Sequence, residues 1–78
     1  MDYDVGQELY YREEGMVLRV EVLENNSNKE REAYRLRVRE VLRDCPILAK
    51  STEEGHEFSC DKLRGVCAGG LWHLTEKI

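Results

Sequence analysis

The sequence has few of the residues that interrupt regular structure. Its 78 residues include one proline and six glycines, and 41% of the chain is apolar. This composition excludes a disordered linker, which is richer in proline and poorer in apolar residues. The length fits a single domain over residues 1–78. Its core must be thin, because a domain this small buries only about 60% of the surface that its unfolded chain exposes.

Long apolar runs and catalytic motifs are also missing. No apolar run approaches the roughly 20 residues of a membrane helix, so no membrane partner is expected. The glutamates are scattered, and an adjacent pair such as Glu13-Glu14 is typical of a solvated turn. Nucleophilic and acid–base catalysis need a base beside the reacting group, and no spacing in the chain indicates one. The sequence therefore predicts a protein that is not an enzyme and has no cofactor.

Closely spaced cysteine pairs of the kind that bind zinc are absent as well. Cys45, Cys60 and Cys67 contain no Cys-x-x-Cys unit. Zinc takes four such ligands, so these cysteines with His73, or with His56, are only candidate zinc or redox residues. Packing of small buried cysteines is the favoured interpretation, and no metal site is assigned. The odd number of cysteines and an acidic N-terminus without an apolar signal segment predict a reducing, cytoplasmic location.

A short phrase of the sequence occurs twice. Gly6 begins a segment of mixed polar and apolar residues that is followed by Gly15, and Gly55 begins a similar segment that is followed by Gly65. Glycines beside alternating segments are typical of hairpin turns. The repeated phrase therefore predicts two strands of a small antiparallel sheet.

Alternation of apolar and polar residues indicates further strands. From Met16 to Leu23, every second residue is apolar and falls on one face of a strand. The residues expected in one core are Leu18, Val20, Val22, Leu36, Val38, Phe58 and Trp72. Other strands are expected over Val5–Arg12, Glu57–Lys62 and Leu71–Thr75, with a short edge segment at Ile47–Lys50 and an exposed connection over residues 25–30.

The segment from Arg31 to Asp44 fits either a strand or a helix. In a strand, the apolar residues Tyr34, Leu36 and Val38 alternate with Arg35, Arg37 and Arg39, and the interruption at Glu40-Val41 predicts a bulge. A helix near residues 29–44 has its own start signal, because Ser27 and Glu30 form a capping box. The strand is favoured because a helix would expose Leu36 and stack arginines four residues apart, where like charges repel.

These patterns together predict a mostly β fold. The favoured architecture is a small antiparallel β-barrel or roll of five or six strands. The alternative is an α+β fold with one helix near residues 29–44. The predicted barrel resembles the SH3-like small barrels in architecture alone. This resemblance does not indicate a function.

Several short motifs follow one another in the second half of the chain. They are Leu36 with Val38, Cys45-Pro46, Gly55-His56-Glu57-Phe58, Gly65-Val66-Cys67 and Leu71-Trp72. In this order they resemble a family of short, uncharacterised prokaryotic proteins. That family has no established activity, so the resemblance implies a compact domain and makes Cys45 and Cys67 the cysteines to test together.

Three classes of function are compatible with this sequence. The leading hypothesis is a small non-enzymatic domain that binds another protein or itself, because a small open sheet leaves a strand edge unpaired. The second is the zinc or redox site described above. The third is nucleic-acid binding through a face that carries Arg35, Arg37 and Arg39, but the net charge of −4 argues against it. We expect these arginines to be solvated and partly paired with acidic neighbours.

Overall fold

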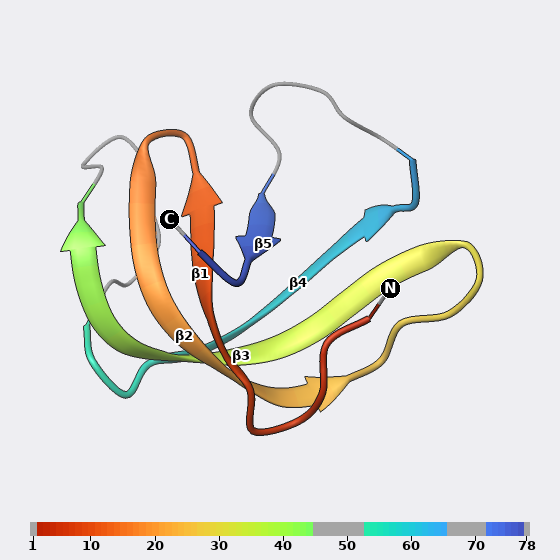
Figure 1. The fold of residues 1–78 in the computed structure, drawn as a ribbon, viewed down its shortest axis with the longest axis horizontal. Coiled ribbons are helices and arrows are strands. Elements are labelled where there is room, and N and C mark those ends of the chain that lie inside the picture. Colours follow the sequence, from red (N-terminus) through yellow and green to blue (C-terminus); the bar gives the residue numbers. More distant parts are fainter. Residues whose placement is uncertain (1, 45–52, 66–71, 78) are drawn as a thin grey trace.

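The computed structural model describes residues 2–44, 53–65 and 72–77, and within them it contains five strands and no helix. The strands are β1 (Glu8–Glu13), β2 (Met16–Asn25), β3 (Arg31–Arg43), β4 (Glu57–Leu63) and β5 (His73–Thr75). They form one antiparallel sheet in the order β4-β3-β2-β1-β5. The sheet curls into a half-barrel (Figure 1). This confirms the predicted mostly β fold, whereas the edge segment expected at Ile47–Lys50 lies outside the described residues.

The segment with two interpretations is the long strand β3, so the helical alternative is wrong. Its residues pair with β2 on one side and with β4 on the other. These two ladders satisfy backbone groups that a helix would have paired internally. The expected capping box does not form. The Ser27 hydroxyl instead donates to the Ala33 carbonyl at 3.2 Å and accepts from the Ala33 amide at 2.9 Å.

The bulge predicted at Glu40-Val41 is present as two shifts in the pairing of β2 with β3. Arg19 pairs with Glu40 while the next residue, Val20, pairs with Val38, and a second shift lies between Val17 and Leu18. Extra residues in one strand bend it and increase its twist. These shifts therefore contribute to the curl of the sheet.

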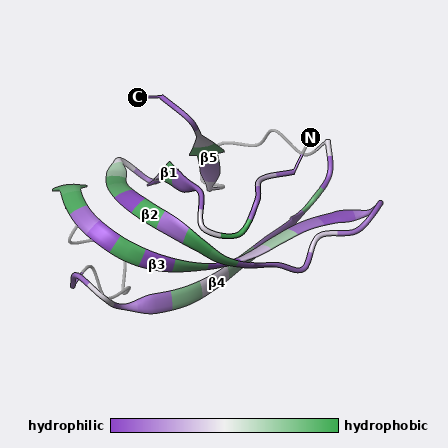
Figure 2. Ribbon diagram, turned by 60° about the horizontal axis from the view of Figure 1, so that its bottom comes forward, coloured by the Kyte–Doolittle hydropathy of each residue, from purple (hydrophilic) through white to green (hydrophobic). Residues whose placement is uncertain are grey.

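The core lies on the concave face of the half-barrel. Its buried residues are Leu9, Tyr11, Met16, Leu18, Val20, Val22, Tyr34, Leu36, Val38, Cys60 and Trp72. Figure 2 shows the alternating apolar and polar bands along β2 and β3 that place these side chains on one face. All core residues expected from the sequence belong to this cluster except Phe58, which is partly buried against it.

The repeated glycine phrase marks two equivalent corners of the sheet. The amide of Gly6 donates to the Val22 carbonyl at 2.7 Å, and that of Gly55 donates to the Val38 carbonyl at 2.7 Å. Each valine amide donates back to the residue after the glycine, at 3.0 and 2.8 Å. The φ angles of Gly6 and Gly55 are 90° and 85°. Residues with a Cβ avoid this backbone region, which explains the glycine in both copies.

The two halves of the four-stranded part of the sheet are related to each other by an internal two-fold axis. It exchanges β1 with β4 and β2 with β3, with its centre near the pair formed by Glu21 and Arg37. The related pairs are Glu8–Glu21 with Glu57–Arg37, Leu9–Val20 with Phe58–Leu36, Tyr10–Arg19 with Ser59–Arg35, and Tyr11–Leu18 with Cys60–Tyr34. The repeat in the sequence is therefore a repeat in the structure.

Candidate functional site

The two outer strands of this symmetric core differ in what covers them. β5 pairs with the outer edge of β1, opposite Tyr10–Arg12. The internal two-fold relation maps Tyr10–Arg12 onto Ser59–Asp61 of β4. No strand among the described residues pairs with that edge of β4. The sheet thus has an edge position on β4 equivalent to the one that β5 fills on β1.

The backbone groups on the outer edge of β4 follow from alternation. Successive residues of an antiparallel strand direct their N–H and C=O groups to opposite sides. The Arg64 amide donates to the Glu30 carbonyl across the β3 side at 2.9 Å. The Asp61 carbonyl points the other way, where it accepts the indole N–H of Trp72 at 3.1 Å. The residues of β4 that direct both groups outward are thus Glu57, Ser59, Asp61 and Leu63.

Trp72 closes one half of this edge. Its ring stacks on Tyr11 at a centroid distance of 6.2 Å and meets Tyr34 edge-on at 6.3 Å. Lys62 lies over the same ring at 4.5 Å and donates to the Trp72 carbonyl at 3.0 Å. These contacts bridge the opening of the half-barrel beside Asp61. The stretch from Glu57 to Ser59 lies beyond them.

The side chains of this stretch present one apolar and one charged surface. On the concave side, Phe58 is partly buried and meets Tyr11 edge-on at 5.1 Å. On the convex side, the exposed Glu57 accepts hydrogen bonds from Arg35 at 2.9 Å and Arg37 at 3.1 Å. The hydrogen bond from Arg35, and to a smaller extent the one from Arg37, lowers the pKa of Glu57. Its carboxylate therefore stays ionised to a lower pH than that of an ordinary glutamate.

The convex face of the sheet is a network of opposite charges. Its ion pairs join Arg19 to Glu8 and Glu40, Arg31 to Asp61, Arg35 to Glu24 and Glu57, Arg37 to Glu21 and Glu57, and Arg39 to Glu8 and Glu21. The prediction that Arg35, Arg37 and Arg39 pair with acidic neighbours is confirmed. Each of these guanidinium groups already has carboxylate partners, which compete with phosphate for it.

The structure does not bring the described zinc or redox candidates together. Cys60 is buried in the core, whereas His73 is exposed and pairs with Arg12 at the β1–β5 edge. Its neighbour Leu74 faces Tyr11 and packs on the core, so His73 is directed to the convex face. Cys45 and Cys67 lie outside the described residues. The described part of the chain contains no group of three potential ligands around a common point.

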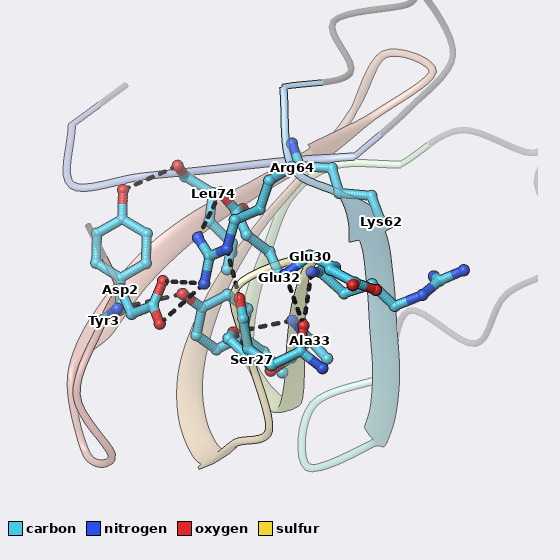
Figure 3. A network of polar contacts seen from close by, with 12 residues as sticks. Asp2, Tyr3, Ser27, Glu30, Glu32, Ala33, Lys62, Arg64 and Leu74 are labelled. Carbon is cyan, nitrogen blue, oxygen red and sulfur yellow. Dashed lines mark hydrogen bonds and ion pairs between the residues drawn. The ribbon is translucent and has the colours of Figure 1, made fainter.

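A second polar cluster was not predicted from the sequence. Arg64 forms an ion pair with Asp2 at 2.9 Å, donates to the Asn28 carbonyl at 2.6 Å and lies 3.7 Å from Glu32 (Figure 3). Nearby, the Tyr3 hydroxyl donates to the Leu74 carbonyl at 3.1 Å. These contacts hold the N-terminal segment across the end of the barrel. No pattern in the sequence could reveal them, because their partners are up to 71 residues apart.

Comparison with known proteins adds no assignment to this geometry. No protein-family model, no curated protein and no solved structure matches the chain. The resemblance to short prokaryotic proteins therefore stays a prediction. Among the residues that the structure describes, no helix has the length and apolar character needed to span a membrane.

Proposed function

We propose that this domain is a non-enzymatic protein-interaction module that binds an extended segment of another protein along β4. The observation that carries the proposal is the internal two-fold relation: β1 has a strand on its outer edge, and the equivalent edge of β4 has none among the described residues. Unpaired strand edges bind extended segments through main-chain hydrogen bonds, while alternate side chains supply specificity.

The position of the bound segment follows from Trp72. Since the Asp61 carbonyl already accepts the indole N–H, the segment pairs with the preceding stretch, Glu57–Ser59. The outward amide and carbonyl groups of Glu57 and Ser59 supply its main-chain partners.

The chemistry of the segment follows from β5 and from charge. In β5, Leu74 faces the core between two polar residues, His73 and Thr75. We expect the bound segment to repeat this pattern of β5, with an apolar residue that packs on Phe58 and a polar residue on either side of it. Glu57 already accepts hydrogen bonds from Arg35 and Arg37, so a basic residue in the segment is favoured by the net charge of −4 of the protein and not by an available carboxylate at this edge. A second copy of this chain suits it less, because two molecules of net charge −4 repel each other.

A display library of linear peptides tests this proposal. The wild-type domain is used for selection, and each selected peptide is then measured against Ser59→Pro and Ser59→Val. Proline removes the outward amide of Ser59 without removing a bond to β3, whereas valine keeps that amide. We expect selected peptides to contain an apolar residue beside a basic one, to bind Ser59→Val and to lose at least tenfold in affinity for Ser59→Pro.

Several outcomes would overturn the proposal. They are a selection without binders, peptides that bind Ser59→Pro as well as the wild type, and a sedimentation run in which the domain alone is a stable dimer that Ser59→Pro dissociates. The last result would assign the edge to a second copy. Circular dichroism of both variants establishes that each retains its fold.

A further inference from the structure

We infer that a depression beside the β1–β2 turn binds a small oxyanion of the phosphate type through Arg12 and Arg43. The depression has a volume of about 280 Å³. Its lining includes the basic residues Arg12, Arg43 and His73 and the acidic residues Glu13 and Glu14. It lies apart from the Glu57–Ser59 stretch of β4, so the inference is independent of the proposed function.

Strand pairing brings the basic residues of this depression into one row. His73 pairs with Arg12 across β5 and β1, Arg12 pairs with Val17 across β1 and β2, and Val17 pairs with Arg43 across β2 and β3. Neighbouring strands lie about 4.8 Å apart, so Arg12 and Arg43 flank the shorter Val17 from the two sides. Their long side chains can reach one ligand above the valine.

These two arginines differ from the others in the chain. Six of the eight arginines form an ion pair with a carboxylate: Arg19, Arg31, Arg35, Arg37, Arg39 and Arg64. Within residues 2–44, 53–65 and 72–77, no carboxylate lies within ion-pair distance of Arg12 or Arg43. The protein has 16 acidic and 12 basic residues. Two guanidinium groups that have no carboxylate partner in the described part of the chain, and that face one depression, can therefore bind an external anion.

The acidic residues near the depression set the strength of binding. The carboxylate of Glu13 accepts a hydrogen bond from the hydroxyl of the buried Tyr11. This bond holds the Glu13 carboxylate on the concave side of β1. Glu14 is exposed in the turn, where its charge opposes an anion. Guanidinium groups hold phosphate and carboxylate alike through forked hydrogen bonds. Two guanidinium groups favour the doubly charged phosphate over a singly charged carboxylate, and the exposed imidazole of His73 adds a further donor.

The test is a titration of the full chain with inorganic phosphate, followed by NMR of the arginine Nε–Hε groups. Matched titrations use sodium chloride at equal ionic strength and sodium acetate. We expect saturable shifts at Arg12 and Arg43 with phosphate, weaker shifts with acetate and none with chloride. Arg12→Gln and Arg43→Gln should each weaken phosphate binding about tenfold, because a charge-assisted hydrogen bond is lost.

Two further variants make the test specific. Glu14→Gln should strengthen phosphate binding several-fold, because it removes the opposing charge. Arg31→Gln, which removes an arginine paired with Asp61 elsewhere on the sheet, should leave it unchanged. Shifts that follow ionic strength alone would overturn the inference, as would equal phosphate affinity in Arg12→Gln, Arg43→Gln and Arg31→Gln. Stronger binding of acetate than of phosphate would overturn the assignment of phosphate and identify a carboxylate as the ligand. Ser59→Pro leaves this site intact, so failure here is distinguishable from failure of the proposed function.

Discussion

Trp72 donates its indole N–H to the backbone carbonyl of Asp61 at a distance of 3.1 Å. Trp72 immediately precedes β5 at one edge of the sheet, and Asp61 belongs to β4 at the other edge. One side chain thus joins the two edges of the half-barrel. The same residue separates the closed part of the β4 edge from the stretch proposed to bind a partner.

Trp72→Phe should lower the free energy of unfolding by about 1 kcal/mol. Phenylalanine keeps an aromatic ring beside Tyr11 but removes the only hydrogen-bond donor of the side chain, and a typical hydrogen bond contributes about that much. Trp72→Ala should cost about 3–5 kcal/mol, because it also leaves a cavity. Urea unfolding of the variants measures both values. An unchanged free energy of unfolding in Trp72→Phe would show that the indole N–H contributes nothing.

Val20→Asp should prevent folding. Val20 is fully buried in the sheet, and an unpaired buried charge costs several kcal/mol. Val17→Asp is the matched control. Val17 lies in the same strand, three residues earlier, and is paired with the two basic residues Arg12 and Arg43. This variant should fold, as judged by far-ultraviolet circular dichroism. A folded Val20→Asp protein would contradict the assigned core.

Glu57 should titrate below its ordinary pKa of 4.5, because the hydrogen bonds from Arg35 and Arg37 favour its ionised form. A group with a lowered pKa in the folded state stabilises the protein above its unfolded-state pKa. This contribution is lost as the pH falls through the folded-state pKa. Carbon-13 NMR of the Glu57 carboxyl group measures the value directly. Titration at or above 4.5 would show that the two arginines do not hold Glu57 in solution.

The glutamine variant of this residue supplies the matching stability test. The difference in stability between the wild type and Glu57→Gln should be largest near neutral pH and should shrink in acid. The measurement is a series of urea unfolding curves at stepped pH. A difference that grows as the pH falls would contradict the assigned ion pairs.

Three neighbouring arginines of β3 should not bind nucleic acid. Arg35, Arg37 and Arg39 each have carboxylate partners, and a phosphate backbone would have to displace them. Titration of labelled single- and double-stranded oligonucleotides at low and moderate salt should show no micromolar affinity. The opposite result is micromolar binding to duplex DNA with a log–log salt slope near −0.9 per neutralised phosphate, abolished when all three arginines are replaced by serine.

The positions of the strands and of the core could be predicted from the sequence. Period-two alternation determines which side chains share a face of a strand, and Leu18, Val20 and Val22 are accordingly buried. The glycine phrase likewise determined two turns, because Gly6 and Gly55 adopt positive φ angles that other residues avoid. Both signals are local, so neighbouring residues suffice to recognise them.

The candidate site could not be predicted in this way. The sequence indicated that a strand edge must be unpaired, but only the order of the strands in the sheet shows that the outer strands are β4 and the short β5. The partners of Arg35 and Arg37 come from β2 and β4, so their pairing depends on strand register. The same register separates Arg12 and Arg43 from the carboxylates that neutralise the other arginines.

Local sequence thus determined the strands, the turns and the buried faces of this protein, because backbone preference and alternation act over a few residues. The tertiary structure decided the rest. It made residues 31–43 a strand instead of a helix, because β2 and β4 satisfy the backbone of that segment on both sides. It also placed Trp72 beside Asp61, a contact between residues 11 positions apart that follows from closure of the half-barrel around the aromatic core.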